Sequence, residues 1–345
     1  MQVADFHFEL PQELIAQRPA DRRDASRLLV LDRATGAREH RVFTDLPSLL
    51  RPGDLLVRND TKVIPARVVA RRRTGGRLRI LLVGEADRGV WEALATGADA
   101  RDGERLLVED AEGQATQWEI EVLSRQAGTW RIRLGDETPW ARLEALGRAP
   151  LPPYIRRPAG ADPQAREDLD RYQTVYAAEA GAIAAPTAGL HFTPAVLEAL
   201  AARGVRVASI TLHVGVGTFL PVKAERVEDH RMSAERFRVP EETAREIELA
   251  RGERRRVIAV GTTVCRTLET VARTGASEGE TDLFITPGFE FRAVDVLLTN
   301  FHLPEGTPLL LACAFGGRER VLEAYREAVS LRYRFFSYGD AMLIA

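Results

Sequence analysis

A histidine ends the segment AAPTAGLHFT, residues 184–193, directly before a predicted helix. The free N–H groups and the dipole of a helix N-terminus favour an anion there, such as a carboxylate or a phosphate. His191 itself could carry a proton near neutral pH, or it could simply cap and pack the helix. The residue type fits both interpretations equally, so this segment alone does not establish a site.

A second histidine, His213, lies in LHVGVGTFLPV, residues 212–222. Gly215 and Gly217 would let a flat ring approach the backbone, which suits a nucleoside, although a β-bulge explains them as well. The segment is not a dinucleotide-binding fingerprint, because Leu220 stands where the third glycine should be. It therefore indicates a nucleoside pocket without a Rossmann signature.

Three further segments lie at predicted chain turns, and two of them combine polar and aromatic residues. VGTTVCRTLE, residues 260–269, connects a strand to a helix, as ligand sites in open α/β sheets do, and a plain helix cap is the alternative. TNFHLP, residues 299–304, and FFSYGD, residues 335–340, place aromatics beside polar groups. Such groups suit stacking on an exposed base, and they also suit ordinary packing at a sheet edge.

The rare lysines and asparagines are unevenly distributed. The chain has only Lys62 and Lys223, and only Asn59 and Asn300, whereas arginine is abundant. A lysine kept among so many arginines suggests a position where an ammonium is needed, since the two cations differ in shape and donor geometry. Asn59 and Lys62 fall together in RNDTK, residues 58–62, which makes this segment a further candidate, with chance survival as the alternative.

The composition excludes several classes of protein. The chain has 345 residues, 45% hydrophobic and 28% charged, with a formal net charge of −2, so non-specific coating of nucleic acid is not expected. Its two cysteines, Cys265 and Cys313, cannot form a disulfide framework, and no metal-type spacing occurs. Neither a leader nor a membrane-length apolar run is apparent, so we expect a cytoplasmic protein.

The elements that position these segments indicate an α/β fold in two domains. Residues 68–148 alternate in short stretches separated by turns, which predicts a small antiparallel β-barrel inserted into a larger domain of residues 1–67 and 149–345. In the second half, Thr193 should cap a helix that starts at Pro194 and ends before Gly204. Alternating strands (VRVASITL, VIAV, TDLFITPG) and helices then predict a mostly parallel sheet.

Taken together, these segments resemble one family. The chain contains, in this order, DASRLLVLDR, GDLLVRNDTKVIPARV, LPPYIRR, DRYQTVYA, AAPTAGLHFT, LHVGVGTF, VGTTVCRTLE, TNFHLP and YRFFSYGDAMLI. The same ordered blocks are typical of the S-adenosylmethionine:tRNA ribosyltransferase-isomerases of queuosine biosynthesis. The resemblance runs from the first thirty residues to the last ten and thins in the inserted domain.

The resemblance implies a reaction and a fold. A family member transfers the ribosyl part of S-adenosylmethionine to 7-aminomethyl-7-deazaguanine at the wobble position of tRNA with a GUN anticodon. It isomerises that group, giving epoxyqueuosine-tRNA, adenine and methionine. The implied fold is a barrel-like large α/β domain with an inserted β-barrel, commonly a monomer. No metal or bound cofactor is implied, because S-adenosylmethionine is a substrate.

This chemistry suggests roles for particular residues. Three proton transfers near neutral pH require side chains with tuned pKa values. The expected proton carriers are His191, His213 and Asp60, with Lys62 steadying the charge of Asp60. The expected nucleoside pocket consists of Thr187, Gly189, Gly215, Gly217, Thr218, Thr262 and Thr263. Candidates for binding the amino-acid carboxylate or RNA phosphates are Arg23, Arg27, Arg67, Arg171 and Arg266. Candidates for holding the deazaguanine are Tyr172, Tyr338 and Asp340. Further candidate substrate-binding residues are Asn59, Glu235, Asn300 and His302.

Two positions depart from the family pattern. Ser233 stands where a second histidine is expected after EDH, so either that histidine is dispensable or His230 takes its role. Gly306 stands where a serine is common, and Pro308 stiffens the next turn.

Two other classes of function also remain open at this point. A non-catalytic RNA-binding protein would not require the dense histidine, glycine and threonine loops, and a methyltransferase would release S-adenosylhomocysteine instead of adenine.

Overall fold

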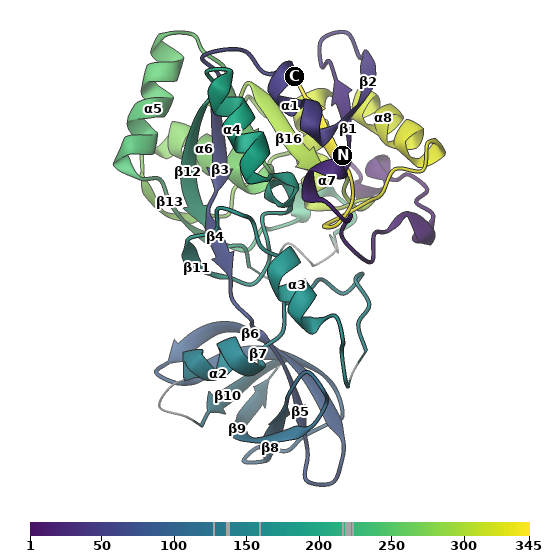
Figure 1. The fold of residues 1–345 in the computed structure, drawn as a ribbon, viewed down its shortest axis with the longest axis vertical. Coiled ribbons are helices and arrows are strands. Elements are labelled where there is room, and N and C mark those ends of the chain that lie inside the picture. Colours follow the sequence, from purple (N-terminus) through teal and green to yellow (C-terminus); the bar gives the residue numbers. More distant parts are fainter. Residues whose placement is uncertain (127, 136–138, 159, 216, 218–221, 223) are drawn as a thin grey trace. The chain divides into compact units, whose positions relative to one another are not determined.

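A computed structural model describes residues 1–126, 128–135, 139–158, 160–215, 217, 222 and 224–345. The chain divides into two compact units (Figure 1). The larger unit comprises Met1–Lys62, Thr174–Glu179 and Ala185–Ala345, and the smaller unit comprises Val63–Gln173 and Ala180–Ala184. None of the helices within the described residues is both long and apolar enough to span a membrane.

The larger unit is built on a nine-stranded mixed sheet. Its strands, in spatial order, are β15 (Glu278–Thr281), β13 (Glu235–Arg238), β12 (Arg206–Leu212), β3 (Leu55–Asn59), β14 (Val257–Val260), β16 (Val296–Asn300), β17 (Ala341–Ile344), β1 (Arg27–Leu31) and β2 (Arg38–Val42). The central strands β12, β3, β14 and β16 are parallel neighbours. The strands on either side include antiparallel pairs, so the sheet is less uniformly parallel than predicted.

Both faces of the central strands are covered, as the burial of all four residues of β14 indicates. The helices are α1 (Leu46–Leu49), α4 (Pro194–Ala202), α5 (Glu241–Gly252), α6 (Thr262–Thr274), α7 (Thr307–Gly316) and α8 (Arg318–Ser330). Ile258 and Val260 of β14 share one core cluster with Leu200 of α4. Helix α4 starts as predicted, since the Thr193 hydroxyl accepts a hydrogen bond from the Val196 N–H.

The smaller unit contains a closed antiparallel barrel, and the predicted α/β class with an inserted barrel is confirmed. Its strands are β5 (Arg67–Arg71), β6 (Arg77–Asp87), β7 (Val90–Gly97), β8 (Arg105–Glu109), β9 (Ala115–Gln126) and β10 (Thr129–Leu134). Along β6, Leu78, Ile80 and Leu82 are buried in alternation, as expected for residues that fill a barrel. Two short strands, β4 (Thr61–Val63) and β11 (Glu179–Ala182), pair where the chain passes between the units.

The smaller unit extends beyond the predicted insertion of residues 68–148. It contains α2 (Pro139–Leu146), which lies within the predicted insertion, and α3 (Ala165–Arg171), which lies beyond it. The Arg148 guanidinium donates to the carbonyls of Asp110 (2.8 Å) and Gly160 (2.9 Å), which ties the following segment to the barrel. These contacts join residues far apart in the sequence, which explains why a change in composition did not reveal them.

One predicted strand is wrong. In TDLFITPG, strand β15 ends at Thr281, and the segment from Asp282 onward leaves the sheet. The central strand of this region is instead β16, whose five residues are all buried. The apolar residues Leu283 and Ile285 suggested a strand, but they pack beside α6 in an irregular segment.

Candidate functional site

The carboxyl ends of the parallel strands place four candidate segments along one edge of the large sheet. His213 follows β12, Asp60 follows β3, Thr262 follows β14, and Asn300 ends β16. Ligands in open α/β sheets bind at such an edge. The order β12–β3–β14–β16 therefore brings together residues that are up to 240 positions apart in the sequence.

Asn59 shapes the turn that presents Asp60. Its side-chain Nδ2 donates to the Leu212 carbonyl (2.9 Å), and its Oδ1 accepts from the N–H groups of Leu212 (3.0 Å) and Thr61 (3.1 Å). The amide is buried, and its donor and acceptor are both bonded to backbone. Asn59 thus ties β3 to β12 and opens the turn into β4, which makes it a positioning residue and not a free ligand for substrate.

Asp60 and His213 form a pair of titratable groups beside this turn. The Thr211 hydroxyl donates to Asp60 Oδ1 (2.7 Å), and the Thr61 hydroxyl is hydrogen-bonded to His213 Nδ1 (2.9 Å). Burial, assisted by Glu179, raises the pKa of Asp60 above 3.8. Burial and nearby Arg236 lower the pKa of His213 below 6.5. The pKa of the carboxyl and that of the imidazole are thus shifted toward each other, and both shifts are caused mainly by burial beside the turn.

Lys62 does not steady Asp60 in the predicted way. The lysine is exposed on β4, and among the described residues no ion pair joins it to Asp60. The positive charge that acts on Asp60 comes from Arg58, which partly offsets the rise in the pKa of that carboxyl caused by burial and Glu179. Arg58 Nε donates to the Ser209 hydroxyl (3.2 Å), and the guanidinium carbon lies 4.1 Å from the centroid of the Tyr176 ring.

Gly189 lies where any side chain would collide with Tyr176. A Cβ added at Gly189 would stand 2.2 Å from the Tyr176 hydroxyl and 2.9 Å from Thr174 Cγ2. Both hydroxyls, of Tyr176 and Thr174, are buried and have no hydrogen-bond partner among the described residues. Gly189 and the half-buried Thr187 belong to one short 3-10 helix, Thr187–His191. The close approach gives a packing reason for the glycine of the segment.

His191 occupies a more enclosed position near the end of β16. Its Nδ1 is hydrogen-bonded to the Ser26 hydroxyl (2.7 Å), and its ring stacks on Phe43 with the centroids 5.0 Å apart. Burial lowers the pKa of His191 to about 4, although Asp340 and Asn300 act in the opposite direction. The ring is therefore neutral at physiological pH, which suits a hydrogen-bonding role better than the transfer of a proton to solvent.

Two polar residues of TNFHLP form hydrogen bonds with other groups of the protein. Asn300 is buried, and its Nδ2 donates to the Phe336 carbonyl (2.9 Å). His302 Nε2 is hydrogen-bonded to the Thr299 hydroxyl (2.7 Å), and burial lowers the pKa of His302 to about 3. These contacts hold β16 against the FFSYGD segment.

Asp340 is the centre of a buried ion pair. Its carboxylate accepts from the N–H of Arg27 (2.9 Å) and of Arg334 (2.8 Å), and Arg27 Nη2 lies 3.0 Å from Oδ2. The Arg27 guanidinium also covers the ring of Tyr333 at 4.0 Å. Because these contacts occupy both oxygens, the structure gives Asp340 and Arg27 a role in joining β1 to β17. Neighbouring Tyr338 is buried, and Arg23 donates to the Leu190 carbonyl (3.3 Å).

Glu235 and Arg266 form a second buried ion pair. Glu235 Oε1 accepts from the Gly215 N–H (3.0 Å), so the pair also holds the glycine segment after His213. Arg266 donates further to the carbonyls of Leu283 (2.9 Å) and Thr281 (3.1 Å). Arg266 is thus a support for its surroundings, and its donors are directed at protein groups. The described Gly217 lies against Ser233, whose Oγ would be 3.0 Å from an added Cβ.

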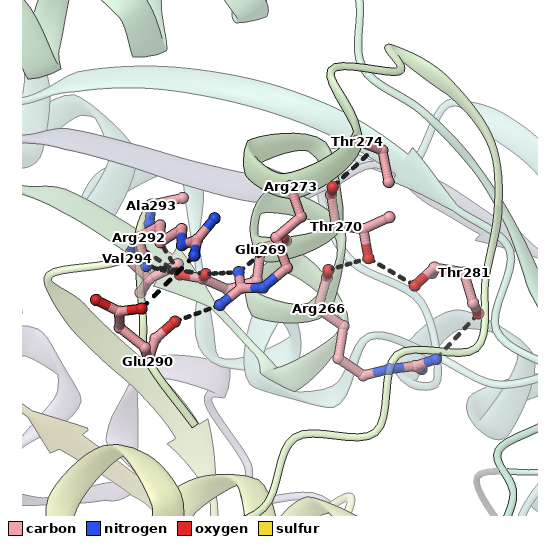
Figure 2. A network of polar contacts seen from close by, with 10 residues as sticks. All are labelled: Arg266, Glu269, Thr270, Arg273, Thr274, Thr281, Glu290, Arg292, Ala293 and Val294. Atoms are coloured by element: carbon pink, nitrogen blue, oxygen red, sulfur yellow. Dashed lines mark hydrogen bonds and ion pairs between the residues drawn. The ribbon is translucent and has the colours of Figure 1, made fainter. Parts of the chain in front are cut away.

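Helix α6 anchors both ends of the segment 282–294, as Figure 2 shows. At one end, the Thr270 hydroxyl is hydrogen-bonded to the Thr281 hydroxyl (2.7 Å). At the other end, the buried Glu269 carboxylate accepts from the consecutive N–H groups of Arg292, Ala293 and Val294. Arg273, one turn further along α6, is paired with Glu269 at 2.6 Å. The segment is thereby fixed beside the N-terminus of α6.

This arrangement creates two adjoining hollows in the larger unit. One lies at the start of α6 and α7 and is lined by Met232, Thr262, Thr263, Arg266, Leu283, Phe284, Ile285, Thr307, Pro308 and Leu311. The other shares Met232 and Phe284 with it and includes His230 and Asp282. Of these residues, Thr262, Thr263 and Arg266 were predicted from the sequence. Phe284, Met232 and Thr307 were not, because no spacing relates them to the α6 segment.

The remaining candidate residues lie in the smaller unit or outside the described residues. Arg67, Arg171 and Tyr172 belong to the smaller unit, and Tyr172 is buried there. Burial lowers the pKa of Arg67. Thr218 lies outside the described residues. Within the described residues, no three His, Cys, Asp or Glu side chains are grouped so that they could hold a metal ion.

The sequence reasoning also missed residues that act on the Asp60–His213 pair. Arg58, Thr61, Tyr176 and Glu179 all influence its charge or geometry. Arg58 and Thr61 flank Asp60 in the segment already singled out, so position alone could have suggested them. Tyr176 and Glu179 lie in DRYQTVYA and just beyond it, where only the resemblance gave a signal.

Comparison with known proteins agrees with this geometry. A profile of the family described as "Queuosine biosynthesis protein" matches residues 3–344. Proteins named S-adenosylmethionine:tRNA ribosyltransferase-isomerase are similar to the chain over its full length. The one from Anaeromyxobacter sp. is 54% identical (100% of this chain, 99% of that protein), and the one from Thermotoga maritima is 49% identical (100% of each).

The fold has a solved counterpart. The crystal structure of the S-adenosylmethionine tRNA ribosyltransferase from Thermotoga maritima matches with a TM-score of 0.57 and 40% identity, covering 99% of this chain and 100% of that one. The resemblance seen in the ordered sequence blocks is therefore confirmed. The chain belongs to the queuosine biosynthesis protein family, together with the S-adenosylmethionine:tRNA ribosyltransferase-isomerases.

Proposed function

We propose that this protein transfers the ribosyl group of S-adenosylmethionine to 7-aminomethyl-7-deazaguanine at the wobble position of tRNA with a GUN anticodon. The transferred group is isomerised to an epoxycyclopentanediol, so the products are epoxyqueuosine-tRNA, adenine and methionine. The observation that carries the proposal is the Asp60–His213 pair at the sheet edge, whose pKa shifts converge. The family membership supports the reaction class.

The pair supplies what the chemistry requires. The sulfonium acidifies the neighbouring C5′ protons, so the reaction can start when a base removes one. Adenine leaves most easily when an acid protonates it, and the aminomethyl nitrogen attacks only when it is neutral. Asp60, with its raised pKa, is a stronger base than an ordinary carboxylate. The lowered pKa of His213 keeps its imidazole neutral, so that it can accept a proton and return it.

We assign His191 a different role from His213. Because its ring is buried and neutral, His191 acts as a hydrogen-bonding support between Ser26 and the β16 end of the sheet edge. Five other candidate residues are also assigned a positioning role, since each is bonded to groups of the protein: Asn59, Arg27, Asp340, Glu235 and Arg266. The nucleoside pocket is assigned to residues of the edge, Gly215, Gly217, Thr187 and Gly189. Thr262 and Thr263 are assigned to the adjoining part of S-adenosylmethionine.

The finer features follow the same proposal. The protein would act as a monomer in the cytoplasm, where tRNA is available, and would need no bound metal or cofactor. Arg67 and Arg171 of the smaller unit are proposed tRNA contacts, whereas Tyr172, expected to hold the deazaguanine, is buried and is not proposed as one. The arginines of β5 and β6 are less available to bind tRNA phosphates than their number implies, because Arg71 and Arg77 are both paired with the buried Glu109.

A reconstituted reaction tests the proposal. Purified protein, S-adenosylmethionine and tRNA bearing the aminomethyl-deazaguanine are mixed, and adenine, methionine and the digested nucleosides are followed by mass spectrometry. We expect adenine in stoichiometric amount with the new epoxycyclopentanediol nucleoside. Formation of S-adenosylhomocysteine would instead identify a methyltransferase, and tight tRNA binding without turnover would indicate a non-catalytic protein. A family member of known activity serves as the control for the tRNA.

A further inference from the structure

The N-termini of two helices open into the same hollow. Thr262 and Thr263 begin α6, and Thr307 and Pro308 begin α7, and all four line the space. The residues before the helices, Gly261 and Gly306, make no side-chain cap. The first N–H groups of α6 have no partner within that helix, whereas in α7 Pro308 lacks an N–H and the N–H groups of Leu309 and Leu310 already donate to the Gly306 carbonyl. The hollow therefore receives free donors from α6 and the positive dipole ends of both helices.

A second observation at the same place points to a ligand. The Thr263 side chain is 8% exposed, and its hydroxyl oxygen is buried without a hydrogen-bond partner among the described residues. Buried hydroxyl groups are normally bonded, since leaving one unsatisfied costs free energy. The neighbouring hydroxyl Thr267, one turn later, is by contrast bonded to the Thr263 carbonyl (3.0 Å). The orphaned hydroxyl therefore marks a group that is missing from the hollow.

The walls indicate which anion fits. Met232, Leu283, Phe284, Ile285 and Leu311 give the hollow an apolar lining, which suits a carboxylate on a short aliphatic chain better than a hydrated phosphate. The only guanidinium in the lining, Arg266, is already paired with Glu235.

The adjoining hollow supplies groups for a cation. It shares Met232 and Phe284 and contains Asp282, an exposed carboxylate. An aromatic ring and a carboxylate are the usual partners of a sulfonium or an ammonium. The hollow at the helix N-termini has a cavity volume of about 20 Å³, which is room for little more than one water-sized group, and the adjoining hollow has about 250 Å³. The first therefore suits a single small group such as a carboxylate, and the longer part of a ligand would occupy the second.

We propose that the hollow between the N-termini of α6 and α7 binds the methionyl carboxylate of S-adenosylmethionine. The carboxylate accepts from the N–H groups at the start of α6 and from the Thr263 hydroxyl. The methionyl chain lies along Met232 and Phe284, with the cationic part toward Asp282. This inference rests on the proposed function, and it assigns to helix N-termini the role that arginine residues were expected to fill.

The first test removes the orphaned hydroxyl. Thr263→Val keeps the shape of the side chain, and the matched control is Thr274→Val at the exposed end of the same helix. Calorimetry measures the Kd for S-adenosylmethionine and for its decarboxylated analogue, without tRNA. We expect Thr263→Val to weaken S-adenosylmethionine binding about tenfold, as loss of a hydrogen bond to a charged group does, and Thr274→Val to bind normally. The decarboxylated analogue should bind the wild type and Thr263→Val equally.

The second test fills the site with a carboxylate of the protein. Thr262→Glu places a negative charge in the first turn of α6, where it stabilises the helix, so the variant is expected to fold. Thr262→Gln is the uncharged control of the same size. We expect Thr262→Glu to weaken binding of S-adenosylmethionine more than tenfold and Thr262→Gln to weaken it less, with unfolding midpoints no lower than that of the wild type.

The outcomes separate this inference from the proposed function. Equal affinity of the wild type, Thr263→Val and Thr262→Glu for S-adenosylmethionine overturns the inference, even if the wild type modifies tRNA normally. Binding that depends on Thr263 and on the carboxylate supports the inference, even if the wild type releases no adenine and the proposed function fails.

Discussion

Two regions along the carboxyl ends of the parallel strands, one at β12 and β3 and the other at β16, place histidines in contrasting surroundings. At the β12–β3 end, His213 is half-buried, bonded to Thr61, and close enough to Asp60 and Glu179 for both carboxylates to raise its pKa against the effect of burial. At the β16 end, His191 is buried, stacked on Phe43, and its pKa is lowered to about 4. The same residue type can therefore exchange protons in one place and brace the fold in the other.

The difference teaches that motif membership does not assign a role. Both histidines lie in glycine-containing segments beside strands and helices, and both have one ring nitrogen bonded to a hydroxyl. What separates them is access to solvent and the charge nearby. The following measurements test that distinction, from the largest expected effect to the smallest.

Replacing His213 should produce the largest loss. We expect His213→Gln to reduce the single-turnover rate of adenine release by about 10²–10⁴-fold, the range typical of a lost general acid or base. His40→Gln is the control, because His40 lies on β2 at the outer end of the sheet order, with its ring bonded to Tyr333 (2.7 Å) and Glu327 (2.9 Å). A near-normal rate for His213→Gln would remove the pair from the mechanism.

The stability of the protein should depend on pH through His191. Its folded pKa of about 4 lies below the ordinary value of 6.5, so the unfolded chain takes up the proton first. This contribution to stability is present above pH 6.5 and is lost as the pH falls to 4, on the order of 3 kcal/mol.

Denaturant unfolding at several pH values measures this dependence. His191→Gln should show a smaller fall in unfolding free energy between pH 6.5 and 4 than the wild type, and His213→Gln should differ less from the wild type. If His213→Gln flattened the curve as much as His191→Gln, the two surroundings would not differ as described.

At constant pH, His191→Gln should affect stability more than chemistry. Loss of the Phe43 stack and of the Ser26 hydrogen bond should lower the free energy of unfolding by about 2 kcal/mol at pH 7.5. The single-turnover rate of the folded protein should stay within about tenfold of the wild type. A rate loss as large as that of His213→Gln, with unchanged stability, would move the proton chemistry to the β16 end.

The smallest effect is expected from Thr61, which orients the His213 ring. Thr61→Val removes the hydroxyl bonded to Nδ1 (2.9 Å) and should slow single turnover about fivefold to tenfold. Thr61→Ser keeps the hydroxyl and should retain most of the rate. Equal rates for the two variants would show that the hydrogen bond does not matter for the position of the ring.

Local signals in the sequence predicted the helices well. The Thr193 cap, Pro194 and the glycine after α4 each act within a few residues, and the structure confirms that helix. The edge strand at TDLFITPG failed for the opposite reason. The Leu283 carbonyl accepts from Arg266 of α6, and Ile285 is buried beside that helix, which local periodicity does not show.

The candidate site was predicted as a set of segments but not as a set of roles. The strand ends bring Asp60, His213 and Thr262 to one edge. The strands before His213 and Thr262 were predicted, whereas the strand before Asp60 was not. Asp340 and Arg27 were expected to bind substrate, yet they pair with each other across 313 positions of sequence. Whether a polar residue is free or already paired depends on such distant partners, and a single sequence does not contain that information.

The contact between Gly189 and Tyr176 restricts the order in which this protein can change. A mutation to alanine at position 189 meets both the Tyr176 hydroxyl and the Thr174 methyl group. Such a mutation becomes tolerable only in a lineage that has first lost bulk at both of those positions. The three sites therefore form one epistatic unit, and a genetic screen for suppressors of Gly189→Ala should return changes at 174 and 176 before any others.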